Sequence, residues 1–245
     1  MQSNPIILIA VVCGFFLLLL GMIVFVVLFI RKESAEKAKI AQSLGLTPAA
    51  DTQQLLQKVA SVNGITSSGL YRLEQVFHRH HDSGEDVYLF SLHRSYFNEQ
   101  GVNRGKRPTG SHKMTLEASV LAFISSSWKL PRFVALPRLG GDGKLADIGN
   151  SLSEAAAEIK QEVVKFPHIP NLDEQYLIAT PETPASQVNP PERFLRVLTA
   201  HPNLRLHAGG DTITLSYANS NSQIPDEEKM KHLYKIGMQL AQELK

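Results

Sequence analysis

The chain has 245 residues, with 25 Lys and Arg against 23 Asp and Glu, and a formal net charge of +2. This near balance argues against a nucleic-acid-binding domain, which usually carries a clear basic excess. The single cysteine, Cys13, excludes intrachain disulfides and any cysteine-cluster metal site.

The N-terminal region contains one long apolar block. Residues 5–30 read PIILIAVVCGFFLLLLGMIVFVVLFI, without a charge, an Asn or a Gln. This run exceeds the roughly 18 apolar residues that mark a spanning helix. The preceding tail, MQSN, has no basic side chain, so a cleaved signal peptide is not indicated. The sequence predicts an uncleaved transmembrane helix over residues 5–30.

Charges on the two sides of this block predict its orientation. Arg31, Lys32, Lys37 and Lys39 follow it, whereas residues 1–4 carry no charged side chain. Because basic residues favour the cytoplasmic side, residues 1–4 are predicted outside the cytoplasm and the rest of the chain inside it. The lipid bilayer is then the first predicted partner.

Two helices are predicted in the juxtamembrane region, residues 31–64. The first continues from the apolar block to Leu44 and ends at Gly45, and the second begins after Asp51 as its N-cap. The pair can be a stalk or oligomerisation element, or a spacer whose apolar side packs on the following domain. The second alternative is favoured.

Residues 65–245 are predicted to form one cytoplasmic domain that begins with strands. The segments 70–81 and 86–97 flank the turn DSGE and predict a β-hairpin. Two further strands are expected around residues 114–139, broken by Pro131, with Pro137 marking an edge or an end. A helix over residues 145–159 should then cover the sheet.

The rest of the domain mixes short strands and helices. A strand is predicted over residues 175–180, and a helix after it has Asn189 as N-cap and Pro190 at its first position. A hairpin is centred on Gly209 and Gly210, and an amphipathic helix closes the chain and packs on the sheet. Because strands cluster without regular βαβ alternation, the predicted class is α+β with a mostly antiparallel sheet covered by helices.

The histidine run is the first candidate for chemistry. His78 and His80 share a strand face, and His81, His93 and nearby acids (Asp82, Glu85 and Asp86) lie close in sequence. These residues are weak candidates for a metal site. The favoured alternative is a solvated hairpin end, and no cofactor is predicted.

A basic loop is the second candidate. Arg104, Lys106, Arg107 and Lys113 lie among Gly, Pro and Ser. They are weak candidates for contact with anionic lipid headgroups, and a solvated loop is the favoured alternative.

Glycines suggest little further chemistry. The segment RLGGDGKLAD does not fit a P-loop, and no G-x-S-x-G or H-E-x-x-H motif occurs. Gly14 and Gly21 lie seven residues apart on nearly one face of the apolar helix. That face is a candidate for helix packing against the same chain or another membrane protein.

Two stretches carry a resemblance to a known group. KLPRFVALPR, and the region from KFPHIPNLDEQYLIATPE through PPERFLRVL to LRLHAGGDTITLSY, resemble a loose group of uncharacterised bacterial membrane proteins. In that group, one or two N-terminal spans precede a cytoplasmic domain of unknown function. The resemblance covers about residues 40 to 220 and implies no catalytic residue.

These observations predict a single-pass membrane protein whose domain is a non-enzymatic binding or assembly module. Two alternatives remain: a membrane-tethered hydrolase or metal-dependent enzyme that uses the region of His78 and His80, and a domain that binds anionic lipid.

Overall fold

A computed structural model describes residues 5–63, 70–97, 113–138, 162–180, 188–218 and 226–245. Within the first helix, the side chains of residues 5–13, 17, 26, 27, 29 and 30 also lie outside the description. The predicted helix over residues 145–159 and nearly all of the basic loop fall outside the described residues.

The centre of the molecule is one antiparallel sheet with strand order β1-β2-β3-β4-β9-β8-β5-β7-β6. Its strands are β1 (Thr47–Pro48), β2 (Leu70–His80), β3 (Asp86–Phe97), β4 (Lys113–Ile124), β5 (Leu130–Pro137), β6 (Glu162–Val164), β7 (Tyr176–Thr180), β8 (Leu204–Gly210) and β9 (Thr212–Tyr217). The described helices are α1 (Pro5–Ser43), α2 (Gln53–Asn63), α4 (Leu172–Gln175), α5 (Glu192–Thr199) and α6 (Glu227–Gln242). The predicted α+β class with a mostly antiparallel sheet is confirmed.

Helices cover both faces of the sheet because side chains alternate along each strand. In β4, Leu121 and Phe123 belong to the large core, which also includes buried residues of α5, α6 and the end of α1. Val120, Ala122 and Ile124 belong to a smaller core that also includes Leu55 and Val59 of α2. Between Val120 and Ile124 the strand is therefore apolar and buried on both sides.

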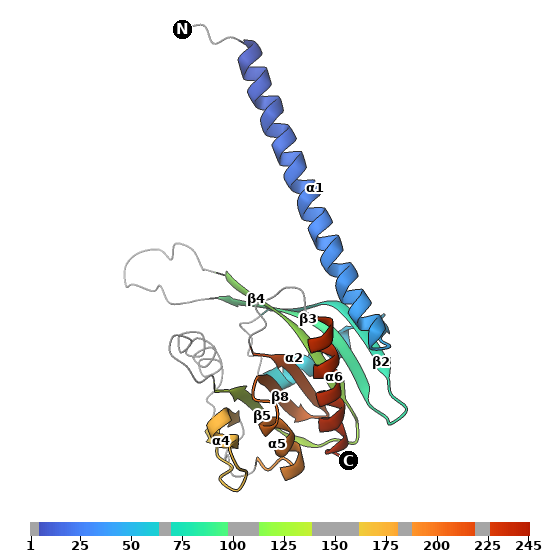
Figure 1. Ribbon diagram of the computed structural model, residues 1–245, viewed down its shortest axis with the longest axis vertical. Helices are drawn as coiled ribbons and strands as arrows, with labels where there is room; N and C mark the ends of the chain where they lie inside the picture. The colour runs from blue at the N-terminus through green and yellow to red at the C-terminus, as the bar shows by residue number, and fades with distance from the viewer. Residues whose placement is uncertain (1–4, 64–69, 98–112, 139–161, 181–187, 219–225) are drawn as a thin grey trace, which may run out of the picture.

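Helix α1 is continuous over 39 residues and stands clear of the domain for most of its length (Figure 1). Only its last turns pack, through Ile40 and Ala41, which are buried in the large core. Gly45 follows with a φ of 73°, so the predicted glycine C-cap is confirmed. A search limited to the described residues finds no helix with the length and apolarity that a membrane crossing requires.

The two helices predicted for residues 31–64 both contribute to the core. The end of α1 packs in the large core, and the Asp51 side chain accepts a hydrogen bond from the Gln53 amide at the start of α2. Val59 of α2 is fully buried. The packing alternative for this region is confirmed, and these helices are continuous with the core of the domain predicted from residue 65.

The expectation that Pro131 breaks the strands was wrong. The break is a turn at Ser125–Trp128, where the Trp128 amide bonds to the Ser125 carbonyl, and Pro131 lies inside β5. It is tolerated there because the pairing with β8 shifts register between Leu130 and Phe133. β5 ends at Pro137 as predicted, but it is flanked by β7 and β8 and is not an edge.

Two other local predictions need correction. Helix α5 begins at Glu192, with Pro191 as its N-cap residue, so Asn189 does not cap it. In the β8–β9 hairpin, Gly209 pairs with Thr212, which makes Gly210 and Asp211 the turn residues. Gly210 has a φ of 59°, a conformation that glycine adopts without steric cost.

The terminal helix packs on the sheet as predicted. Met230, Leu233, Gly237 and Leu240 are buried along one stripe of α6. A side-chain carbon added at Gly237 would lie 2.1 Å from the Phe123 ring, so glycine is needed for this close approach. Sequence patterns did not predict three short elements, namely β1, β6 and α4.

Candidate functional site

Three of the four candidate histidines lie at the end of the β2–β3 hairpin. His78 and His80 point to the same face because they are two residues apart on β2. His78 Nε2 and His80 Nδ1 both contact Asp86 Oδ1, at 2.9 and 3.0 Å. The His78 ring also stacks on Tyr88, with ring centroids 4.5 Å apart. The hairpin end is therefore an ordered cluster of two imidazoles around one carboxylate.

The electrostatics of this cluster favour an ionised Asp86. Partial burial alone would raise the pKa of the Asp86 carboxyl, but hydrogen bonds and charge from His78 and His80 outweigh it and lower that pKa. The carboxylate is already occupied by two partners in this arrangement.

The other two histidines do not join this cluster. His81 points to the opposite face, where its Nε2 lies 2.6 Å from the Tyr234 hydroxyl of α6. His93 lies five residues along β3 from Tyr88, about 17 Å away at roughly 3.4 Å per residue. Its Nε2 is 3.2 Å from Glu74 Oε2. Over the described ranges, no group of three or more His, Cys, Asp or Glu side chains could hold a metal ion. A metal role for the histidines stays a prediction.

The same hairpin end is fastened to the C-terminal end of α6. Lys245 Nζ lies 2.7 Å from Glu85 Oε1 and donates to the Ser83 carbonyl at 3.1 Å. Burial alone would raise the pKa of Glu85, whose side chain is 1% exposed, but the bonds from Lys245 and Ser83 lower it. With the His81–Tyr234 contact, these bonds tie the hairpin to the helix.

A buried charged cluster joins α1 to the sheet. We call it the α1–sheet joint: Glu33, Ser34 and Lys37 of α1, with Gln75 of β2 and Ser91 of β3. Lys37 Nζ donates to Glu33 Oε1 at 2.8 Å and to Ser91 Oγ at 2.7 Å. Lys37 is 5% exposed and Ser91 is 2% exposed. A lysine this buried requires such partners, because an unpaired ammonium in the interior is very costly.

A strained residue lies in the same joint. Gln75 has a φ of 51°, which is unusual for a residue with a side chain. It sits where the β2–β3 pairing shifts register between Glu74 and Phe77, a β-bulge. The Gln75 Nε2 donates to Ser34 Oγ of α1 at 2.5 Å. Contact with α1 therefore helps to hold the bulge.

The Lys37–Ser91 pair resembles a catalytic pair, since an amine beside a serine hydroxyl can activate a nucleophile. Two observations argue against this role. Ser91 is almost completely buried, and the Lys37 ammonium already donates to the Glu33 carboxylate. The contact fits a tether between a helix and a strand.

A second histidine pair was not predicted from the sequence, because its members are distant in the chain. The rings of His201, after α5, and His232, in α6, meet edge to face with centroids 5.3 Å apart. Burial and the neighbouring His232 lower the pKa of His201. Two imidazoles alone do not make up the ligand set of a structural zinc site.

The remaining candidates are placed as follows. Arg104, Lys106 and Arg107 lie outside the described residues, and Lys113 begins β4 with its side chain undescribed. The ends of β3 and β4 that flank the loop in sequence lie at the upper edge of the domain in Figure 1, the edge from which α1 emerges. Side-chain carbons added at Gly14 or Gly21 would meet no atom within 4 Å, so that face of α1 is open.

Comparisons with protein-family models, curated proteins and solved structures give no match. The resemblance to bacterial membrane proteins therefore stays a prediction.

Proposed function

We propose that this chain is a single-pass membrane protein whose α+β domain is a non-enzymatic binding or assembly module. Helix α1 crosses the bilayer, residues 1–4 lie outside the cytoplasm, and the domain lies at the cytoplasmic face. The observation that carries the proposal is the distribution of exposed apolar side chains.

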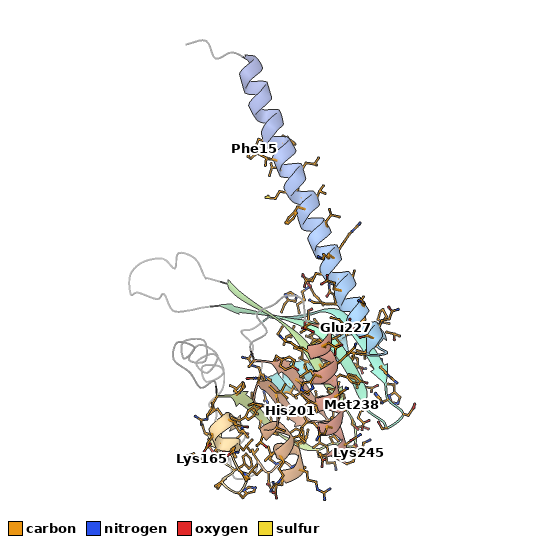
Figure 2. All side chains as sticks on the ribbon, in the orientation of Figure 1. Phe15, Lys165, His201, Glu227, Met238 and Lys245 are labelled. Carbon is orange, nitrogen blue, oxygen red and sulfur yellow. The ribbon has the colours of Figure 1, made fainter. Side chains whose placement is uncertain are left out.

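Eleven large apolar side chains are exposed in the described part of the chain, and ten of them lie on α1 between Phe15 and Leu28. Leu18 is 75% exposed and Phe16 is 70% exposed. Phe15 marks the part of the helix that stands away from the domain (Figure 2). An exposed apolar surface of this kind is unfavourable in water and favourable in hydrocarbon, which supports a lipid environment.

The contacts within the described polar clusters support a binding role. The hairpin-end imidazoles contact Asp86, and Lys37 contacts Glu33 and Ser91. Both clusters connect parts of the fold to each other, and the Ser91 hydroxyl is buried. A rigid domain attached to a membrane helix suits the presentation of a surface to a partner.

Alkaline carbonate extraction of membranes that contain the full-length chain tests the membrane assignment. We expect the chain to remain in the pellet, as an integral protein does, and complete release into the supernatant would contradict the proposal. The orientation is tested with a reporter fused after Lys245. Activity is expected from a reporter that works in the cytoplasm, and activity from one that requires export would reverse the orientation.

Affinity purification of the full-length chain from solubilised membranes tests the binding role. We expect stoichiometric recovery of a specific partner or of a second copy. Turnover of a hydrolase substrate by the purified chain, lost on His78→Ala or His80→Ala, would instead favour the enzyme alternative.

A second candidate function is binding of anionic lipid by the basic loop, and the position of the β3–β4 hairpin favours it. The ends of β3 and β4 that flank the loop in sequence lie at the same upper edge of the domain from which α1 emerges (Figure 1). Each basic residue near an anionic surface contributes roughly 1 kcal/mol. Flotation of the chain without residues 1–31 on anionic vesicles should be salt-sensitive. Equal flotation after neutralising Arg104, Lys106 and Arg107 would exclude this role.

A further inference from the structure

We propose that α1 and the domain move as one rigid body, so that the orientation of the domain at the membrane depends on bilayer thickness. This inference rests on the proposed membrane span. It adds a property that anchoring alone does not require, because a flexible linker would also anchor a domain.

The first step is the length of the apolar part of α1. Residues 5–30 form a helix about 39 Å long at roughly 1.5 Å per residue, whereas a typical hydrocarbon core is about 30 Å thick. A straight helix of this length fits such a core when it tilts by about 40°. In a core about 39 Å thick, the same helix stands upright. Its tilt therefore changes with bilayer thickness.

The second step is the stiffness of the junction between the apolar part and the domain. The α1 backbone is helical without interruption from Pro5 to Ser43. Two ion pairs spaced four residues apart span the junction, Lys32 with Glu36 at 4.0 Å and Glu33 with Lys37 at 2.8 Å. Such pairs stabilise a helix at this position. A bend at the junction would have to break helical hydrogen bonds as well as these contacts.

The third step is the attachment to the sheet, which uses several independent contacts. The α1–sheet joint holds Lys37 to Ser91 and Ser34 to Gln75. One turn further on, Ile40 and Ala41 are buried in the large core, and Arg79 donates to the Leu44 carbonyl at 3.4 Å. Polar and apolar contacts along about two helical turns fix both the rotation and the tilt of α1 relative to the sheet.

These three steps predict that the domain tilts when α1 tilts. The surface that the domain presents to other molecules then changes its angle and height above the membrane. The experiment uses Trp128, the single tryptophan, which is buried in the domain core. It serves as an energy donor to a dansyl-labelled lipid headgroup in the same bilayer.

The full-length chain is reconstituted into phosphatidylcholine vesicles with short, medium or long monounsaturated acyl chains. The matched control carries a flexible Gly-Ser insertion of about 12 residues after Arg31, which separates the proposed span from the α1–sheet joint. We expect the transfer efficiency of the unmodified chain to change progressively across the lipid series, beyond the change that thickness alone produces in the control.

Each outcome decides the inference. Equal dependence on thickness in both chains, or no dependence in the unmodified chain, would overturn it. A third chain, Ser34→Ala with Lys37→Met, keeps the helix but weakens the joint, and a response between the other two would support it. Carbonate extraction of the same vesicles separates this result from a failure of the membrane assignment. A chain that is not integral is released, whereas a chain with a loose joint stays in the pellet.

Discussion

The two halves of α1 have the same backbone conformation and opposite surroundings. Between Phe15 and Leu28, large apolar side chains are exposed, whereas between Lys37 and Leu44 both an ammonium and apolar side chains are buried. The comparison shows that the helix is continuous for two separate reasons. The half that forms the proposed span is helical because a chain in lipid must satisfy its own backbone hydrogen bonds, and the other half is held by packing on the sheet.

The largest effect is expected from charges in the exposed half. Leu18→Arg with Met22→Arg places two guanidinium groups on one face near the centre of the apolar block. At about 2.5 to 3.5 kcal/mol each, they cost roughly 5 to 7 kcal/mol of insertion free energy. We expect a large loss of chain from the carbonate-resistant pellet, with no change in the melting temperature of the domain.

The matched control for this prediction is Lys32→Arg with Lys39→Arg, which keeps arginine outside the apolar block. It should remain fully resistant to carbonate. Equal extraction of both double variants would mean that the exposed half of α1 does not lie in hydrocarbon.

The next effect is expected from the buried half. Ile40→Ala removes a side chain that is 4% exposed in the large core, and such truncations cost about 2 to 5 kcal/mol. We expect a lower melting temperature of the full-length chain in detergent, followed through Trp128 fluorescence, with membrane integration unchanged. Leu28→Ala, on the exposed half, is the control and should leave the melting temperature within error of the unmodified chain.

A smaller effect is expected from the charges of the joint. Lys37→Met leaves the Glu33 carboxylate and the Ser91 hydroxyl without their ammonium partner, which should cost about 1 to 3 kcal/mol of unfolding free energy. Adding Glu33→Leu removes the orphaned charge, so the double variant should recover much of the loss. A double variant that is less stable than the single variant would show that the ion pair is not the cause.

Much of the fold was predictable from local patterns, and the difference between the halves of α1 explains why. A run of 26 apolar residues, the alternation in β8 and β9, and the stripe on α6 are each repeated several times within one segment. Packing of a face against apolar surroundings produces such repetition, so α1, α6 and the β8–β9 hairpin could be predicted. The predictions at Pro131 and Asn189 were wrong because the role of a single proline or cap residue depends on the neighbouring strand or turn. The local sequence does not specify that neighbour.

The candidate site was less predictable because its contacts join distant segments. The sequence analysis counted Lys37 only among the basic residues that predict the orientation of the span. Nothing in RKESAEKAKIAQS indicates that this lysine is buried. Its partner Ser91 lies 54 residues away on β3. The His78 and His80 pairing followed from strand periodicity, whereas the shared carboxylate of Asp86 required knowledge of the strand register.

The smallest effect concerns the end of the β2–β3 hairpin, where the ion pair between Lys245 and Glu85 involves none of the residues of the α1–sheet joint. The folded-state pKa of Glu85 is lowered by Lys245 and Ser83 against the raising effect of burial. A lowered pKa contributes stability above the unfolded-state value, near pH 4.3, and this stability is lost as the pH falls through the folded-state pKa. Glu85→Gln should therefore cost about 1 kcal/mol at neutral pH and progressively less as the pH falls below about 4.

Melting temperatures of the unmodified chain and Glu85→Gln, measured in detergent from neutral to acidic pH, check this expectation. The two curves should converge on the acidic side, because protonation removes the charge that the variant lacks. Combining Glu85→Gln with Lys37→Met should give additive losses, since the two ion pairs share no partner. Strong coupling between them would instead mean that the α1–sheet joint and the hairpin end respond as one unit. The orientation of α1 could then alter the histidine cluster itself.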